Sequence, residues 1–439
     1  MDKVVKASPT KEFFVNMLVR DILLKQAIIE LIDNSIDGAR SIRKNNQYLG
    51  LKISVEFDKK RFMIKDNCGG IPLDVAENYA FRFGRPKTVE SGESETTGIF
   101  GIGMKRALFK IGNKFSIHSV TKTTEFQLDL DVREWLKKDD SDWDFSFSSY
   151  KDNMNNSEDI IGTTIMVTDL NSEIAAELGA EEFENEVIEH IQRRVGLDIA
   201  YGIAISVNER SLVGNNIELI NNDEIKPIKE EYQDGEISVK ILSGIAPREG
   251  KNYPPEKAGW YIYCNGRLVV AADKTSLTTW KDMENKSSGV VFHNNYAGFR
   301  GLVYFNSKHP EMLPWNTTKT GLDETSLVYL RAREKMLEIF KIVKNTLDEI
   351  RKNTENKDDG VEETIATMLG TEMTIENVNK VKVNRSVSIK DVSVVTIPNV
   401  TISYKKPKKE AEELKKVLGV KSYREVGEKT FEYYMDAEC

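Results

Sequence analysis

One short segment combines the side-chain types that phosphate chemistry needs, at helical spacing. The run from Glu30 to Ala39 reads ELIDNSIDGA and carries Glu30, Asn34 and Asp37. Residues spaced i, i+4 and i+7 lie on one face of a helix, so these three side chains can share one cleft. Hydrolysis of a phosphoanhydride needs a carboxylate that activates water and oxygen ligands for a magnesium ion. Glu30 and Asn34 supply both, although a solvated polar helix face is the alternative interpretation.

A second segment, Asp66 to Ile71, reads DNCGGI and directly follows an expected strand. The adjacent glycines permit a sharp turn and the close approach of a ligand. A carboxylate held before such a turn, here Asp66, can accept a hydrogen bond from the exocyclic amine of adenine. Taken alone, the segment is more typical of a plain turn between two elements.

A glycine-rich run, GIFGIGMKRA, extends from Gly98 to Ala107. Its glycines let backbone amides approach phosphate oxygens, and the helix expected after them adds the positive end of its dipole. Neither a P-loop nor a dinucleotide fingerprint fits the spacing. The polar stretch 85–97 before it suits a lid that orders on nucleotide binding, or an ordinary flexible loop. The residues expected to contact the nucleotide here are Gly98, Phe100, Gly101, Ile102, Gly103, Met104 and Lys105.

A late strand of the same domain opens with Gly162-Thr163-Thr164-Ile165. The hydroxyl of Thr163 could support the adenine-binding carboxylate or a water beside it. Alone, this signal carries little weight, because threonine is common in strands.

These segments need a layered α+β domain to position them, and the pattern predicts one over residues 1–215. Two helices are expected between residues 10 and 44, the first with an apolar side. Strands are expected at 51–57 and 62–64, joined by a turn at 58–60, and again near 115–117, 126–130 and 165–167. The expected apolar side of the first helix consists of Phe13, Phe14, Met17 and Leu18.

A second domain is predicted over residues 216–352. Strands are expected at 237–242, 260–263 and 302–305, and apolar residues recur at helical period from 323 to 352. Asn265-Gly266 is a strong signal for a hairpin turn, because both residues tolerate positive φ. The polar run 353–360 indicates a linker to a C-terminal region ending at 439, whose lysine-rich run 405–409 favours a solvated face. Its closing aromatic residues predict either a surface for a protein partner or a small extra core.

Bulk composition excludes several classes of protein. With 439 residues, 40% hydrophobic and 30% charged, the chain matches ordinary globular proteins. No apolar leader and no apolar run of about 18 residues are present, and Cys68, Cys264 and Cys439 are too scattered for a disulfide framework. We therefore expect a cytoplasmic protein without a membrane partner. A net charge of −8 argues against a nucleic-acid binder that uses its whole surface, but leaves a local basic groove open.

The four segments, in this order and at these intervals, resemble the GHKL ATPases, which include gyrase, the heat-shock chaperone, histidine kinases and MutL. The Gly-Met-Lys-Arg-Ala run and the second domain are most similar to the MORC proteins and their bacterial relatives. The resemblance covers about residues 10 to 350. It implies a Bergerat-fold α/β sandwich, an S5-like transducer domain and a small C-terminal region.

The resemblance also assigns roles. Glu30 matches the base that activates water, Asn34 the magnesium ligand and Asp66 the adenine reader. Cys68 departs from the pattern, because many members have glycine there. The other matching positions are Asp37 in the nucleotide cleft, Gly70 beside adenine, Thr163 behind it, and Gly98, Gly101 and Gly103 at the hinge of the phosphate-facing lid. The implied cofactors are ATP and Mg²⁺.

Transducer domains of these ATPases send a lysine to the terminal phosphate. The candidate is Lys319, in the segment LPWNTTKT between the last strand and the long helix. A cation there would sense the terminal phosphate and couple hydrolysis to the angle between the domains. A solvent-exposed loop lysine is an equally strong interpretation.

The function expected from these observations is a magnesium-dependent ATPase that acts as an ATP-gated homodimeric clamp or switch. The resemblance to MORC and MutL suggests nucleic acid as its target, in genome maintenance or defence. The alternatives are a chaperone-like ATPase machine and a protein kinase of the histidine-kinase type. The second fits poorly, because none of the four histidines lies on an obvious helical hairpin ahead of the pocket.

Overall fold

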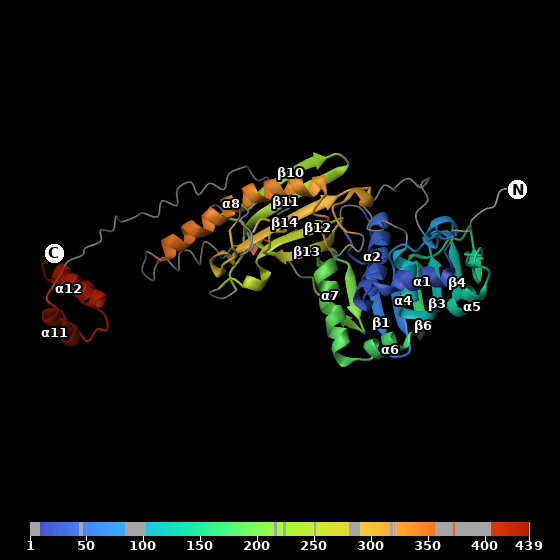
Figure 1. The fold of residues 1–439 in the computed structure, drawn as a ribbon, viewed down its shortest axis with the longest axis horizontal. Helices are drawn as coiled ribbons and strands as arrows, with labels where there is room; N and C mark the ends of the chain where they lie inside the picture. The colour runs from blue at the N-terminus through green and yellow to red at the C-terminus, as the bar shows by residue number, and fades with distance from the viewer. Residues whose placement is uncertain are drawn as a thin grey trace. The chain divides into compact units, whose positions relative to one another are not determined.

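The computed structural model describes residues 9–43, 47–83, 102–214, 217–222, 225–249, 252–280, 290–316, 319, 321–355, 372–373 and 405–438. The chain divides into two compact units, residues 1–389 and residues 390–439. The first unit contains two layered domains of mixed helix and sheet, so the expected α+β class is confirmed (Figure 1). No helix in the described ranges has the length and apolar character needed to cross a membrane.

An eight-stranded sheet forms the base of the first domain, in the order β5-β4-β3-β6-β2-β1-β7-β8. The predicted hairpin is present, because β1 and β2 pair in antiparallel fashion on either side of the turn at 58–61. Strand β6 pairs with both β2 and β3, which places Asp66, Thr163 and Ser119 side by side. The strands are β1 (Lys52–Phe57), β2 (Phe62–Asp66), β3 (Gly112–Val120), β4 (Glu125–Asp131), β5 (Ser149–Lys151), β6 (Gly162–Leu170), β7 (Ala204–Val207) and β8 (Arg210–Ser211).

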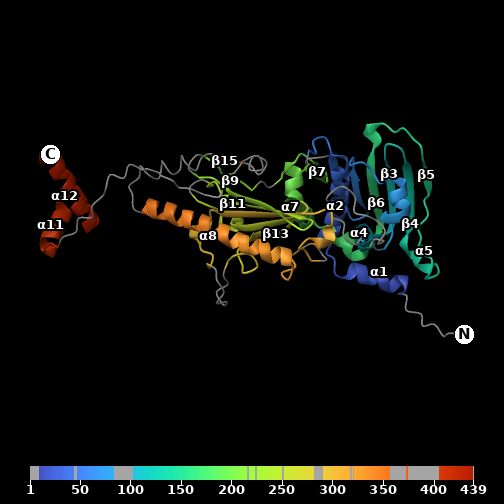
Figure 2. The same cartoon turned by 90° about the horizontal axis from the view of Figure 1, so that it is seen from above.

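Helices α2 and α4 lie against one another over one face of this sheet (Figures 1 and 2). The helices of the domain are α1 (Lys11–Arg20), α2 (Leu24–Ile42), α3 (Leu73–Val75), α4 (Gly103–Ile111), α5 (Val132–Lys137), α6 (Ser172–Leu178) and α7 (Glu181–Ala200). Helix α4 also contacts α1, and α2 also contacts α7. Helix α2 is therefore held on two sides by other helices.

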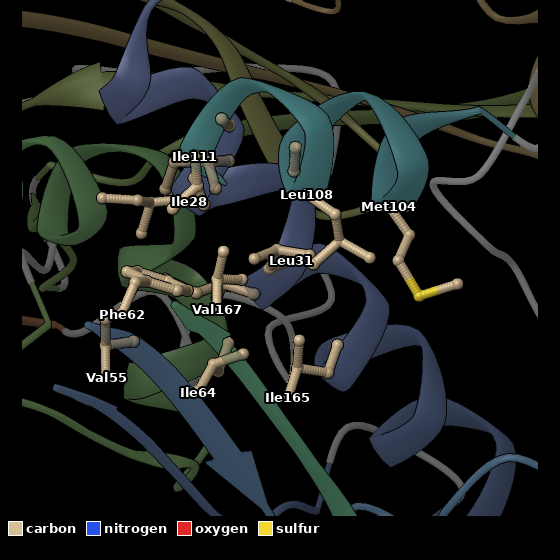
Figure 3. Close-up of a cluster of buried hydrophobic side chains, with 14 of the residues drawn as sticks. Ile28, Leu31, Val55, Phe62, Ile64, Met104, Leu108, Ile111, Ile165 and Val167 are labelled. Atoms are coloured by element: carbon tan, nitrogen blue, oxygen red, sulfur yellow. The ribbon is translucent and has the colours of Figure 1, made fainter. Parts of the chain in front are cut away.

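Apolar side chains between the helices and the sheet fix the position of α2 (Figure 3). Ile28 and Leu31 of α2, with Leu108 of α4, are buried against Ile64 of β2 and Val167 of β6. Full burial of such side chains contributes about 1.5–3 kcal/mol each. Because this side of α2 is committed to the core, the polar residues at the intervening positions project elsewhere.

The apolar side predicted for α1 is only partly correct. Leu18 is buried, but the side chains of Phe13 and Met17 are 61% and 51% exposed. The helix instead buries Lys11, whose ammonium donates to the carbonyls of Trp135 and Lys138, both at 3.2 Å. These bonds satisfy a buried cation and set the rotation of α1, which apolar spacing alone did not indicate.

A five-stranded mixed sheet with one long helix forms the second domain. Its strand order is β10-β11-β14-β12-β13, and the β12–β14 pair is parallel. Helix α8 contacts β11 and β14, and a cluster of buried apolar side chains lies between the helix and the sheet. The elements are β10 (Ile228–Asp234), β11 (Ile237–Ile245), β12 (Gly259–Cys264), β13 (Arg267–Asp273), β14 (Phe299–Asn306) and α8 (Leu327–Glu355). Its relation to S5-like domains stays a prediction.

The hairpin predicted at Asn265-Gly266 is present. These two residues have φ of 45° and 77°, and they join β12 to β13 so that Cys264 pairs with Arg267. Positive φ at both central residues is the requirement of a tight primed turn. The turn brings the first residue of β13, Arg267, against the first domain.

The C-terminal region differs in part from a simple linker and tail. Strand β15 (Glu372–Met373) pairs with β9 (Leu219–Ile220), so a piece of the expected tail returns to the second domain. The second unit contains helices α11 (Lys408–Leu418) and α12 (Tyr423–Glu438). Val426 is buried, whereas Phe431, Tyr433 and Tyr434 are exposed. A protein-binding role for this region stays a prediction.

Candidate active site

Asp66 closes β2 in a network of hydrogen bonds. Its Oδ1 accepts from the amides of Cys68 (2.9 Å) and Thr163 (3.3 Å), and its Oδ2 accepts from the hydroxyl of Ser35 (2.6 Å). Burial raises the pKa of Asp66, against the lowering effect of these bonds. A carboxylate has about four lone-pair sites, so Oδ2 retains the capacity to accept from an adenine amine.

The turn that follows Asp66 is pinned to the sheet. Gly69 and Gly70 have φ of 101° and 71°, and a Cβ at Gly70 would lie 2.2 Å from the carbonyl oxygen of Val120. The hydroxyl of Ser119 accepts from the amide of Ile71 at 2.7 Å. The turn therefore needs glycine for both its conformation and its contact with β3.

Thr163 supports Asp66 through its backbone. The predicted role was for its hydroxyl, but that group hydrogen-bonds the hydroxyl of Ser119 at 3.2 Å, while its amide donates to Asp66.

Cys68 stands where the resemblance leads us to expect glycine. Its side chain is buried, and its φ is not positive. The departure at Cys68 is therefore accommodated without backbone strain.

Glu30 lies where the two domains meet. Its Oε1 is 3.5 Å from Nη1 of Arg267, and its Oε2 is 3.3 Å from Nζ of Lys319. Burial would raise the pKa of Glu30, but Lys319 and Arg267 outweigh it, and the net pKa is lowered. A Cβ at Gly103 would lie 2.3 Å from Oε2, so the start of α4 directly adjoins the carboxylate. Glu30 is thus ionised and reachable from the glycine-rich segment.

Asp33 forms the second acidic group at this junction. Its side chain is 4% exposed and accepts a hydrogen bond from Nη1 of Arg267, whose side chain is 2% exposed. Burial raises the pKa of Asp33, and the charge of Arg267 opposes that rise. The pair joins α2 of the first domain to β13 of the second.

The other predicted residues of α2 separate into two environments. Asn34 is exposed, one helical turn after Glu30. Asp37 lies 3.4 Å from Arg40, which also pairs with Asp198 of α7 at 2.9 Å. Asp37 therefore takes part in contacts of the helix layer, and its predicted place in the nucleotide cleft stays a prediction.

The glycine-rich run is described only from Ile102 onwards. Gly98, Phe100 and Gly101, with the expected lid at 85–97, lie outside the described residues. Ile102 precedes α4, Gly103 begins it, and Met104 is buried in the core.

Lys105 occupies a position that differs from the expected phosphate contact. Its side chain is buried, and its ammonium donates to the carbonyl of Ala80 at 2.9 Å and lies 6.0 Å from the ring centre of Phe83. Burial lowers the pKa of Lys105 to about 8. In this structure the residue packs α4 against residues 80–83, and a contact with phosphate would require the side chain to move.

Four site residues escaped the sequence reasoning: Ser35, Asp33, Ser119 and Arg267. Ser35 and Asp33 lie inside the ELIDNSIDGA run, and neither falls at the i, i+4, i+7 positions that were considered. Ser119 is buried at a position of β3 that faces inward with Phe115 and Ile117, so a hydroxyl at an expected apolar position was the available signal. Arg267 had the clearest available signal, because it is a charged residue directly after a hairpin turn and is followed by the apolar run 268–272.

Comparison with known proteins identifies the first domain. Residues 22–163 match the family model described as histidine kinase-, DNA gyrase B-, and HSP90-like ATPase. The search of curated proteins found no match. The matched range includes Glu30, Asn34, Asp66, Gly70 and Thr163, and the match supports ATP binding and hydrolysis. Residues 22–163 of this chain are therefore similar to the histidine kinase-, DNA gyrase B- and HSP90-like ATPases.

Proposed function

We propose that this protein binds magnesium-ATP in the first domain and hydrolyses it, with Glu30 as the residue that activates water. The observation that carries the proposal is the position of Glu30. This ionised carboxylate lies beside the start of α4, in a domain of an ATPase family, and a lysine of the second domain reaches it.

The adenine end would be held by Asp66. Its Oδ2 accepts one hydrogen bond, from Ser35, and can accept another from the exocyclic amine of adenine. Gly70 has positive φ and no side chain, which permits the close approach of a ligand. Guanine would present a carbonyl to Asp66 at the same place, so this pairing favours adenine over guanine.

The phosphate end would be held by Asn34 and by the amides at the start of α4. Asn34 is exposed, and an amide oxygen is a ligand type that magnesium accepts alongside phosphate oxygens and water. A bound magnesium ion would neutralise charge on the transferred phosphoryl group. The amino end of α4 contributes the positive end of its dipole.

Glu30 would orient the attacking water and take its proton. Its lowered pKa keeps it ionised at neutral pH, and positioning of this kind contributes about 10²- to 10⁴-fold to rate. Lys319 occupies Oε2, the oxygen that also faces Gly103. We propose that Lys319 leaves Glu30 for the terminal phosphate when ATP binds, which frees this oxygen for water.

At the level of the whole protein, we propose an ATP-gated homodimeric clamp or switch. The proposal rests on the resemblance to MORC and MutL proteins, which also suggests nucleic acid as the target, and on the contacts between the domains at Glu30. A salt titration of nucleic-acid binding, set against binding of an unfolded client protein, would separate a clamp from a chaperone-like machine.

The test of the ATPase assignment is the Glu30→Ala variant of the full chain. It should bind ATP with unchanged affinity and lose turnover by about 10²-fold or more, because only the attacking water loses its partner. Glu134→Ala is the matched control, since Glu134 is an exposed carboxylate on α5 that pairs with Lys137. Normal hydrolysis by Glu30→Ala would refute the assignment.

A further inference from the structure

We propose that Arg267 of the second domain is a positioning residue for Glu30, which fixes one carboxylate oxygen and leaves the other to water or to Lys319. The inference rests on the proposed function, because it takes Glu30 as the residue that activates water. The second domain would then contribute a fixed contact to the site through Arg267, in addition to the movable contact proposed for Lys319.

The guanidinium of Arg267 contacts two acidic residues one turn apart on α2. Nη1 donates to Oδ2 of Asp33 and lies 3.5 Å from Oε1 of Glu30. The side chains of Arg267 and Asp33 are 2% and 4% exposed, and that of Glu30 is 15% exposed. The strong pair with Asp33 anchors the guanidinium, and Glu30 meets a cation whose place is already set.

The turn that carries Arg267 is itself held from both domains. Within the second domain, Asn265 and Ser307 exchange two hydrogen bonds of 2.9 Å. From the first domain, Nη1 of Arg194 on α7 donates to the carbonyl of Leu268 at 2.7 Å. A Cβ at Gly266 would lie 2.5 Å from Nη2 of Arg40, so this turn packs directly on α2. The backbone on either side of Arg267 is therefore fixed.

Lys319 contacts the same carboxylate of Glu30 in a different way. It sits in the segment between β14 and α8, with φ of 54°, and reaches only Oε2. An ammonium on a flexible stem is a point charge, whereas a guanidinium is planar and rigid. Oε1 thus faces an anchored cation, and Oε2 faces both Lys319 and the start of α4, where the phosphates are expected. Release of Lys319 would free Oε2 without releasing Glu30.

The design of the variants follows from the burial of the pair. Removal of Arg267 alone would leave Asp33 as a buried unpaired charge, which destabilises a fold strongly. The double variant Arg267→Gln with Asp33→Asn removes both charges together. Arg267→Lys keeps the charge and loses the planar fork. Arg194→Gln is the matched control, because Arg194 also joins the domains and no contact of it with Glu30 or Asp33 is seen among the described residues.

The experiment measures ATP affinity by calorimetry and single-turnover hydrolysis for the full chain and each variant, with thermal unfolding as a check on folding. In the double variant, turnover should fall by about 10- to 100-fold with ATP affinity unchanged, because Glu30 loses its orientation. The turnover of Arg267→Lys should lie between that of the double variant and that of the wild type. Arg194→Gln removes one support of the turn but leaves Arg267 paired with Asp33, so its turnover should stay well above that of the double variant.

Two results would overturn the inference. One is wild-type turnover in both the double variant and Arg267→Lys. The other is a parallel loss of affinity and turnover that Arg194→Gln shares, which would indicate domain packing alone. If the double variant does not fold, the comparison of Arg267→Lys with Arg194→Gln decides by the same criteria. A failure of the proposed function would be recognised by a different result. In that case Glu30→Ala, which retains Arg267, would hydrolyse ATP normally.

Discussion

Three polar side chains of α2, those of Glu30, Asn34 and Ser35, face different surroundings, and this separates their roles. Glu30 meets the second domain and the start of α4, Ser35 donates to Asp66, and Asn34 is open to solvent. One helix thus connects the adenine end of the proposed site to the phosphate end. Substitutions within it should therefore separate binding from turnover.

Asn34→Ala should abolish both ATP binding and hydrolysis in the presence of magnesium. The amide oxygen is the ligand proposed for the metal, and without the metal the charge of the triphosphate is not neutralised. Calorimetry with ATP, with and without magnesium, measures this directly. Binding that is equally strong with and without magnesium in the wild type would contradict the role of Asn34.

Asp66→Asn should weaken ATP binding by about 10- to 100-fold, because an amide donor would face the adenine amine and leave a hydrogen bond unmade. Protonation of Asp66 should act in the same direction. Burial raises the pKa of Asp66, so on acidification ATP affinity should begin to fall at a higher pH than it would for an ordinary aspartate. Titration of ATP affinity against pH checks this, and Asp66→Asn should lose that part of the pH dependence.

At the scale of elements, the start of α4 is packed so closely on α2 that it sets the position of Glu30. A Cβ at Gly103 would meet Oε2 of Glu30 at 2.3 Å. Gly103→Ala should displace the end of that side chain and lower turnover by about 10- to 100-fold, with little loss of stability. Single-turnover assays and thermal unfolding measure the two effects. Turnover at the wild-type rate would show that the carboxylate is not held there.

Lys105 makes the stability of this helix pH-dependent. Burial lowers the pKa of Lys105 to about 8 in the folded protein, from 10.5 for an ordinary lysine. Between these pH values the unfolded chain binds more protons, so the free energy of unfolding should rise with pH, by at most about 3 kcal/mol. Denaturant unfolding at several pH values should show this rise in the wild type. The same rise in Lys105→Met would contradict the assignment.

The local sequence pattern predicted the helices and strands well, but it predicted the contacts between them poorly. Helical spacing was enough to group Glu30 with Asn34, and Asn265-Gly266 was enough to predict a hairpin. The pair of Asp33 with Arg267 joins residues 234 apart in the chain, and no local signal predicts which acid a distant arginine will meet. The prediction of which side of α1 is buried was partly wrong for a related reason. The hydrogen bonds of Lys11 to distant carbonyls outweigh the apolar spacing.

At the scale of the whole molecule, Arg267 and Lys319 contact α2, and we propose that ATP changes how the domains are joined through these contacts. The family match covers residues 22–163, so the part played by the second domain stays a proposal. If Lys319 moves from Glu30 to the terminal phosphate, its contact with α2 at Oε2 of Glu30 is lost. Such a change would connect the nucleotide to the assembly of two subunits.

The proposed clamp predicts a dimer that depends on the nucleotide. The full chain should be monomeric with ADP and dimeric with a non-hydrolysable ATP analogue, and Glu30→Ala should stay dimeric with ATP. Light scattering coupled to size exclusion measures these states. An unchanged size with every nucleotide would remove the clamp from the proposal, while the ATPase assignment would still stand.

The central claim is that one cleft in the first domain takes up magnesium-ATP. Isothermal titration calorimetry of the intact protein with magnesium-ATP measures this most directly. The structure predicts saturable binding of one nucleotide per chain, retained in Glu30→Ala and lost in Asn34→Ala. The absence of any binding heat for the wild-type protein at several temperatures would contradict the claim.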